Sequence, residues 1–183
     1  TQKNQVDEYC EPNELKPQSP YAETKLKEED MISKKVLEEG LKAVKFRYGT
    51  IFGVSRGMRF HTAVNKFCWQ AVMGDPLTVW ETAYNQKRPY LDIDDCARAI
   101  SFAIKSNMFD GRVYNVVSQN ATVKEVIGCI SKQIPDLKVD FVKHKIMNQL
   151  SYEVLNTRMS EAGFKVKYNL NRGIKETINL LRN

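Results

Sequence analysis

The residues of this sequence that could do chemistry together are a tyrosine and a lysine, Tyr21 and Lys25, in the stretch S-P-Y-A-E-T-K. On a helix, residues four apart lie on the same face, one turn from each other. A lysine ammonium beside a tyrosine favours the phenolate, so the tyrosine can exchange a proton nearer to neutral pH. The pair is therefore a candidate for acid–base catalysis, although two such side chains can also be plain neighbours on a helix surface.

A long helix must position this pair. Ser19 can accept a hydrogen bond from a free backbone N–H at the helix start, and Pro20 suits the first helical position, where no N–H is needed. Apolar residues recur as far as Leu37, and Gly40 is a typical residue at a helix end. The pattern predicts a helix of about 20 residues, roughly 30 Å long.

Length and composition limit the classes of protein that the chain can belong to. With 183 residues, 42% hydrophobic and 27% charged, it has the composition of one soluble globular domain. No apolar run approaches the roughly 20 residues of a membrane span, and residues 1–14 are polar and acidic, unlike a signal peptide. Four scattered cysteines and two histidines show no metal-binding spacing, so we expect reduced thiols, no metal site and a cytoplasmic protein.

The net charge of +6 suits a phosphate-bearing ligand, but it also suits an ordinary solvated surface. A basic nucleic-acid-binding module is a further hypothesis. It has little support, because the lysines and arginines are scattered and form no recognised module. We therefore expect no nucleic acid and no membrane among the partners.

Strand and helix patterns alternate after the first helix. Alternating residues 43–48 predict a strand, and residues 49–53 predict a glycine-bounded turn. Asp94 or Asp95 can cap a following helix, and Thr122 can begin another. The other predicted elements are helices at residues 61–73, 96–106, 159–162 and 170–181, strands at residues 77–80, 88–93, 113–117, 139–142 and 152–155, and loops at residues 1–17, 54–59, 81–87 and 143–151. Such interleaving is typical of an α/β chain.

Several segments match one family pattern in order and spacing. They are P-Q-S-P-Y-A-E-T-K at residues 17–25, R-Y-G-T-I-F-G at 47–53, R-P-Y-L-D-I-D-D at 88–95, V-Y-N-V at 113–116, and A-G-F with G-I-K-E-T-I between 162 and 178. Together the segments resemble the NAD-dependent epimerase/dehydratase family, the extended branch of the short-chain dehydrogenases. The resemblance covers nearly the whole chain.

The resemblance implies hydride transfer to a bound nicotinamide cofactor, NAD or NADP. Tyr21 is then the general acid or base at a sugar hydroxyl. Lys25 holds the nicotinamide ribose and lowers the pKa of the tyrosine. Tyr48 stands where relatives line the nicotinamide pocket, with simple strand packing as the alternative.

On the substrate side, the resemblance implies a nucleoside diphosphate sugar. Arg88 matches the arginine that grips the diphosphate, a role that suits a guanidinium fork. The alternative for Arg88 is a surface ion pair with Asp92 or Asp94. Thr50 stands where most relatives have an asparagine that contacts the substrate, so this contact is altered or lost. The family's later R-x-G-D segment is absent, and the nearest basic candidate is Lys145.

The family's glycine-rich phosphate-binding motif is also absent from these residues, as is its catalytic Ser or Thr. The resemblance therefore implies the C-terminal part of an extended short-chain dehydrogenase. Residues 1–53 and 88–117 would hold the catalytic helix and the end of the nucleotide-binding Rossmann sheet. Residues 54–87 and 118–183 would form a small α/β substrate-binding part, in one unit with the rest, and most of the cofactor site would lie upstream.

The expected function is that of a sugar-nucleotide epimerase or dehydratase when the protein is complete, with these residues alone inactive. The alternative is a non-catalytic piece that binds a nucleotide sugar through Arg88. Relatives pair through the helix that carries the tyrosine, which makes a homodimer an expectation here. Leu26 and Met31 could extend an apolar stripe on that helix, or they could be buried within the subunit.

Overall fold

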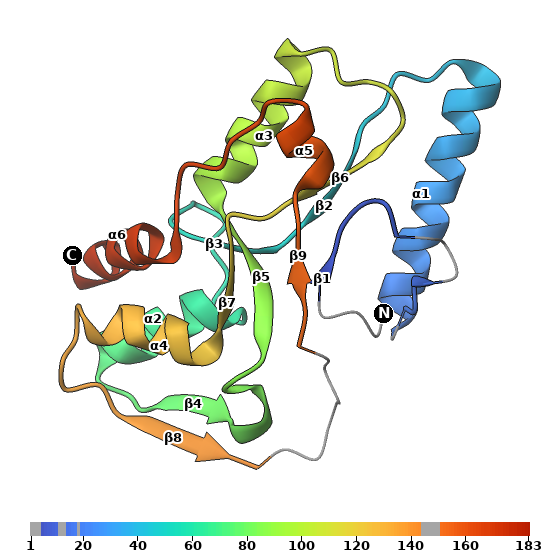
Figure 1. Cartoon of the computed structure of the whole chain (residues 1–183). Helices are drawn as coiled ribbons and strands as arrows, with labels where there is room; N and C mark the ends of the chain where they lie inside the picture. Colours follow the sequence, from blue (N-terminus) through green and yellow to red (C-terminus); the bar gives the residue numbers. More distant parts are fainter. Residues whose placement is uncertain (1–4, 11–13, 18, 144–150) are drawn as a thin grey trace.

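Helix α1 (Pro20–Glu39) stands along one side of the molecule, and the other long helices lie away from it (Figure 1). The computed structural model describes residues 5–10, 14–17, 19–143 and 151–183. The hydroxyl of Ser19 accepts a hydrogen bond from the backbone N–H of Ala22, and Gly40 ends the helix with a left-handed φ of 68°. The predicted helix and both of its caps are confirmed.

The segment of residues 45–52 belongs to two sheets in succession. Its first half, β2 (Lys45–Tyr48), pairs in parallel with β6 (Val113–Val116). Its second half, β3 (Thr50–Phe52), pairs in parallel with β5 (Lys87–Asp92). The remaining pairs are β5 with the antiparallel β7 (Gln119–Thr122), and the parallel pairs β4 (Leu77–Trp80) with β8 (Val139–Val142) and β1 (Gln5–Val6) with β9 (Glu153–Val154).

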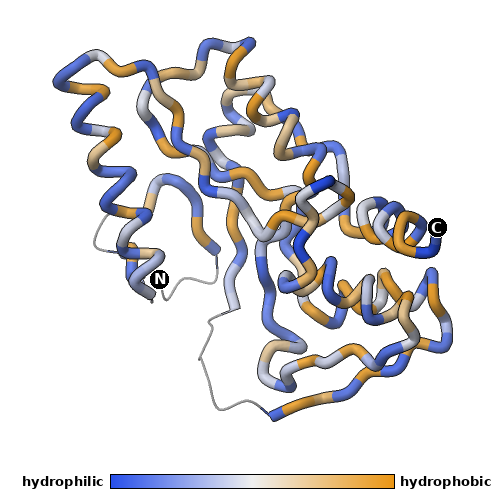
Figure 2. Tube along the Cα trace, turned by 180° about the vertical axis from the view of Figure 1, so that it is seen from behind, coloured by the Kyte–Doolittle hydropathy of each residue, from blue (hydrophilic) through white to orange (hydrophobic). Residues whose placement is uncertain are grey.

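Two apolar clusters hold the elements together. One joins α2 (Ala63–Met73), α4 (Val123–Ser131) and α6 (Leu170–Arg182) to β4, β5 and β7. The other joins α3 (Ile93–Lys105) and α5 (Thr157–Glu161) to β5 and β6. Apolar residues gather along α2, α4 and α6, whereas α1 is largely hydrophilic (Figure 2). Since β5 supplies residues to both clusters, it is the strand that connects the two halves of the molecule.

Helix α1 contributes no buried side chain to either cluster. Leu26 is half-buried, but Met31 is 55% exposed, so burial within the subunit accounts for the first residue and not for the second. In the part of the chain that the structure describes, no helix combines the length and apolarity that crossing a membrane requires.

Two local predictions were wrong. The predicted turn at residues 49–53 contains β3, because Phe52 is buried and pairs with Asp92. The helix cap expected at Asp94 or Asp95 is Asp92, whose side chain accepts a hydrogen bond from the N–H of Asp94 at 2.9 Å. Asp95 is fully buried and has a different role.

Most other elements lie close to their predicted positions, and the α/β class is confirmed. Thr122 begins α4 with a full capping box to Glu125. The short strands β1 and β7 were not predicted, and the predicted loop at residues 81–87 includes a 3₁₀ turn, Glu81–Ala83. Lys145 and most of the predicted loop around it lie outside the described residues.

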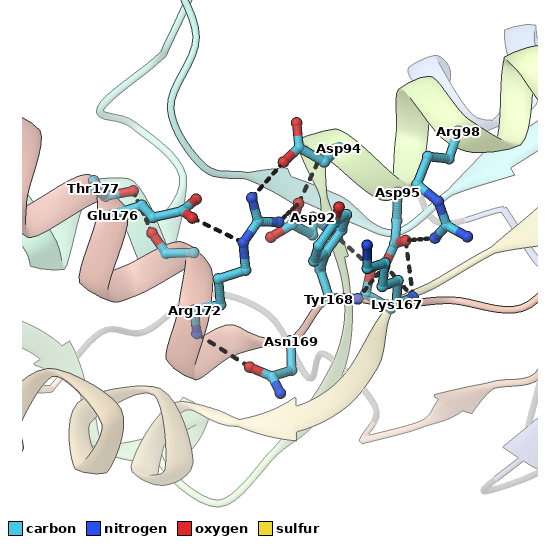
Figure 3. Close-up of polar contacts among 12 residues, drawn as sticks. Asp92, Asp94, Asp95, Arg98, Lys167, Tyr168, Asn169, Arg172, Glu176 and Thr177 are labelled. Carbon is cyan, nitrogen blue, oxygen red and sulfur yellow. Dashed lines mark hydrogen bonds and ion pairs between the residues drawn. The ribbon is translucent and has the colours of Figure 1, made fainter.

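Three carboxylates, the buried Asp92 and Asp95 and the exposed Asp94, attach the C-terminal segment to the start of α3 (Figure 3). Asp95 accepts hydrogen bonds from the N–H groups of Lys167 and Tyr168, both at 3.0 Å. Arg172 of α6 donates to Asp94 at 2.7 Å and stacks on Tyr168, with its guanidinium carbon 3.7 Å from the ring centroid. These contacts fix α6 against the strand end from which α3 begins.

Asp92 belongs to the same contact region and is buried. Burial raises the pKa of its carboxyl, while the hydrogen bond from the N–H of Asp94 and the charge of Arg172 act in the opposite direction. Gly173 of α6 packs closely against Asp92 and Phe52. A methyl group at Gly173 would come within 2.5 Å of the Phe52 ring and 3.0 Å of an Asp92 carboxylate oxygen.

This contact predicts that Gly173→Ala lowers the free energy of unfolding by about 1–3 kcal/mol, because the added methyl overpacks the site. The matched control is Gly128→Ala on α4, where a methyl meets nothing within 4 Å. There, alanine should raise stability by up to about 1 kcal/mol. Urea unfolding of both variants checks the difference, and equal stability of the two variants would contradict the packing described here.

Candidate functional site

The first turn and a half of α1 brings Tyr21 and Lys25 together at the surface. The Lys25 ammonium lies 5.7 Å from the centroid of the Tyr21 ring and donates a hydrogen bond to Glu28 at 2.7 Å. The hydrogen bond to Glu28 is the main cause that raises the pKa of Lys25, with a smaller contribution from Tyr21. Tyr21 is 72% exposed, so both side chains can be reached by a ligand.

Tyr21 and Lys25 line a cavity of about 420 Å³, which we call the tyrosine cavity. It lies between α1, the segment that precedes α1, and the ends of β2 and β9. Its lining includes Val6, Cys10, Glu14, Lys16, Tyr21, Lys25, Tyr48, Gly49, Pro89, Asn115 and Tyr152. Three of the residues selected from the sequence, Tyr21, Lys25 and Tyr48, therefore share one cavity.

Tyr48 borders this cavity, but its side chain lies on the face of the sheet that carries α3. Lys45 and Arg47 contact Glu29 of α1, whereas Tyr48 stacks on Phe46 with ring centroids 5.6 Å apart. A hydrogen bond joins the side chains of Tyr48 and Cys96, and burial is the largest cause that raises the pKa of Tyr48. Cofactor binding by Tyr48 remains a prediction.

A second cavity, of about 390 Å³, holds the two substrate-binding candidates, Thr50 and Arg88. We call it the arginine cavity. Arg88 donates to the side chain of Gln86 at 3.0 Å, and its guanidinium carbon lies 5.4 Å from the centroid of the Tyr152 ring. The other lining residues are His61, Ala63, Lys66, Phe67, Val79, Trp80, Ala83, Gln86, Tyr90 and Val123.

Asp92 and Asp94 form their ion pairs with Arg172, and not with Arg88 as the sequence suggested. Asp94 accepts from Arg172 at 2.7 Å, and a carboxylate oxygen of Asp92 lies 3.8 Å from the same guanidinium. The side chain of Arg88 instead lines the arginine cavity, where a ligand can reach it.

A thin wall of backbone separates the two cavities. Gly49 and Pro89 line the tyrosine cavity, while their chain neighbours Thr50 and Arg88 line the arginine cavity. A Cβ at Gly49 would lie 3.0 Å from the carbonyl carbon of Pro89, so this close approach needs glycine. Tyr152 lines the first cavity and stacks on the arginine of the second.

Glu8 is a site-positioning residue that sequence reasoning did not find. Its side chain is only 7% exposed and accepts hydrogen bonds from the N–H of Asn115 at 2.7 Å and the N–H of Arg158 at 3.3 Å. It thus ties the segment before α1 to β6 and α5. No local pattern predicts this, because the two partners lie more than a hundred residues along the chain.

The polar and aromatic stretch from Arg56 through Trp80 was expected to shape the nucleotide and sugar pocket, but Lys66, Trp80 and Tyr152, which line the two cavities, were not assigned individual roles. For Lys66, one local signal was available. It stands near the start of α2, where the helix dipole disfavours a positive charge. Within the described residues, no group of three or more His, Cys, Asp or Glu side chains could hold a metal ion.

Comparison with known proteins gives the family. The model of the NAD dependent epimerase/dehydratase family matches residues 1–117, which extend through α1, both halves of the 45–52 segment and β6. The chain belongs to this family. The resemblance found in the sequence motifs is thereby confirmed.

Relatives of the family differ widely in sequence. The chloroplastic UDP-sulfoquinovose synthase of Spinacia oleracea is 28% identical over 135 residues, which are 66% of this chain and 25% of that protein. The UDP-glucuronic acid 4-epimerase of Bacillus cereus, solved with UDP-glucuronic acid and NAD, has a TM-score of 0.81 at 22% identity. The dTDP-glucose 4,6-dehydratase of Bacillus anthracis, solved with NAD, has a TM-score of 0.79 at 20% identity.

The structural matches confirm the fold of the extended short-chain dehydrogenases. They cover 94% and 93% of this chain, which spans 56% of the epimerase chain and 54% of the dehydratase chain. A further match with the same fold, RMD of Pseudomonas aeruginosa, is a complex with NADPH.

The position of Glu8 predicts that Glu8→Ala lowers the free energy of unfolding by about 1–3 kcal/mol, because two backbone N–H groups lose their acceptor. Hydrogen exchange at the Asn115 amide should become faster in the same variant. Glu38→Ala on the exposed side of α1 is the control, with a change within about 0.5 kcal/mol. Unchanged exchange at Asn115 would show that Glu8 does not hold this strand edge.

Proposed function

We propose that the complete protein is a nicotinamide-dependent epimerase or dehydratase that acts on a nucleoside diphosphate sugar. The observation that carries this proposal is the pair of adjoining cavities, one with Tyr21 and Lys25 and the other with Arg88. Such an arrangement can hold a diphosphate in one cavity while a sugar hydroxyl reaches the tyrosine in the other. Family membership and the enzymes matched above give the same reaction class.

The residues of the tyrosine cavity fit a nicotinamide ribose. Lys25 presents an ammonium with three N–H donors beside an exposed phenol, and ribose hydroxyls are acceptors for such donors. Tyr48 and Gly49 line the inner end of the cavity. When bound, NAD or NADP supplies the hydride acceptor and donor that epimerisation and dehydration both require.

In the proposed reaction, Tyr21 removes a proton from a sugar hydroxyl and can return one. The positive charge of Lys25 favours the phenolate during this exchange. Glu28 holds the same ammonium at 2.7 Å, so binding of a ribose to Lys25 would weaken or replace that ion pair. Arg88 binds the diphosphate by charge-assisted hydrogen bonds, and Thr50 faces the same ligand from β3.

For the 183 residues alone, we propose binding of the nucleotide sugar without turnover. The arginine cavity is lined by described residues of this chain, whereas no glycine-rich phosphate-binding motif occurs among the 183 residues. We also propose that residues 1–53 and 88–117 form the cofactor-side part of the chain, and that residues 54–87 and 118–183 form the substrate-side part.

We also propose that α1 forms a homodimer contact. None of its side chains is fully buried within the subunit, and Met31 and Leu37 are exposed on it.

Tyr21→Phe should abolish turnover of the complete enzyme, because phenylalanine cannot exchange the proton, and should leave the Kd for the nucleotide sugar within about twofold. Steady-state kinetics and calorimetric titration with UDP-glucose measure the two effects. Tyr168→Phe, which keeps the ring that stacks on Arg172, is the control and should retain full turnover. Turnover by Tyr21→Phe at the wild-type rate would remove Tyr21 from the mechanism.

Arg88→Ala should raise the Kd for UDP-glucose about tenfold or more, because a charge-assisted hydrogen bond to phosphate is lost. Arg112→Ala removes an exposed arginine that lines neither cavity and should leave the Kd unchanged. Equal affinity of the Arg88 variant and the wild type would exclude Arg88 from the binding site.

A further inference from the structure

The arginine cavity carries more positive charge than Arg88 alone provides. Lys66 lines it as well, and no aspartate or glutamate is found among its described lining residues. Asp92, at the end of β5, and Asp94, at the start of α3, are engaged by Arg172. The described lining thus contains two basic side chains, Lys66 and Arg88, and no carboxylate, which favours an anionic ligand.

Lys66 is the less expected of these groups. It lies in the first turns of α2, is half-buried, and its ammonium has no acceptor among the described residues. The first turn of α2 has no acidic residue, and its N-cap Thr62 makes no side-chain hydrogen bond to the helix. A positive charge at this end of a helix opposes the helix dipole, so Lys66 does not stabilise α2 in the free protein.

Arg88 reaches the same cavity from another element. Arg88 belongs to β5, whereas Lys66 belongs to α2, and both residues line the arginine cavity. The contacts with Gln86 and Tyr152 orient the guanidinium. The exposed indole of Trp80 and the buried Phe67 ring add apolar surface to the same lining.

We propose that Lys66 is a second phosphate-binding residue of this cavity, so that Lys66 and Arg88 together hold the two phosphoryl groups of the substrate. This inference rests on the proposed function, since it concerns the diphosphate of the same nucleotide sugar. An anion bound by both side chains would offset the unfavourable position of the Lys66 charge near the start of α2. Lys66 thus acts in ligand affinity and has no part in proton transfer.

The test is binding of UDP and of uridine to the complete protein, with Lys66→Ala, Lys66→Arg and Lys175→Ala compared with the wild type. Lys175 is an exposed lysine of α6 and controls for the change in net charge. Lys66→Ala should raise the Kd for UDP about tenfold or more, because one charge-assisted hydrogen bond to phosphate is lost. Lys66→Arg should recover most of that affinity, and Lys175→Ala should match the wild type. The Kd for uridine, followed by NMR line broadening, should be the same in all four proteins.

The other possible outcomes all contradict the inference, and one of them also contradicts the proposed function. If Lys66→Ala binds UDP like the wild type while Arg88→Ala binds it weakly, the inference is wrong and the proposed function stands. If Lys66→Ala weakens UDP and uridine equally, Lys66 has a structural role, and the inference is also wrong. If the wild-type protein does not bind UDP, both the inference and the proposed function fail.

Discussion

The close approach of Gly49 to the backbone of Pro89 is the constraint on which the candidate site depends. At this point the segment of residues 45–52 leaves β6 and joins β5, and the N–H of Gly49 still donates to the carbonyl of Val116 at 3.0 Å. Any side chain at Gly49 would push the two strands apart. With glycine, the neighbouring residues Gly49 and Thr50, and likewise Pro89 and Arg88, line one cavity each, so the cavity of Tyr21 and the cavity of Arg88 adjoin along this backbone.

Strand β5 connects the close approach at Gly49 with the candidate site, because its successive residues face different surroundings. Arg88 lines one cavity, Pro89 lines the other, Tyr90 and Leu91 enter the two apolar clusters, and Asp92 caps α3. The contacts of Arg172 then hold α6 against the end of the same strand. Stability and site geometry thus rest on one strand, and changes in its packing should affect both.

The sequence predicted the parts of this arrangement that depend on local patterns. The caps of α1, the spacing of Tyr21 and Lys25, and most strands and helices follow from residues close in the chain. Local patterns did not distinguish Asp92 from Asp94 and Asp95, because each is an aspartate at a helix start. Their contacts distinguish them, since Asp92 caps α3, Asp94 pairs with Arg172, and Asp95 accepts hydrogen bonds from the C-terminal segment. The contacts of Glu8 with Asn115 and of Arg88 with Tyr152 join distant segments, so they depend on the tertiary fold.

The most direct test of this account is a crystal structure of the complete protein with a bound UDP-sugar and NAD. The account predicts the diphosphate in the arginine cavity between Arg88 and Lys66, with the sugar passing the Gly49–Pro89 wall and a sugar hydroxyl within hydrogen-bond distance of Tyr21. A diphosphate bound outside the arginine cavity, or a sugar that points away from Tyr21, would contradict it.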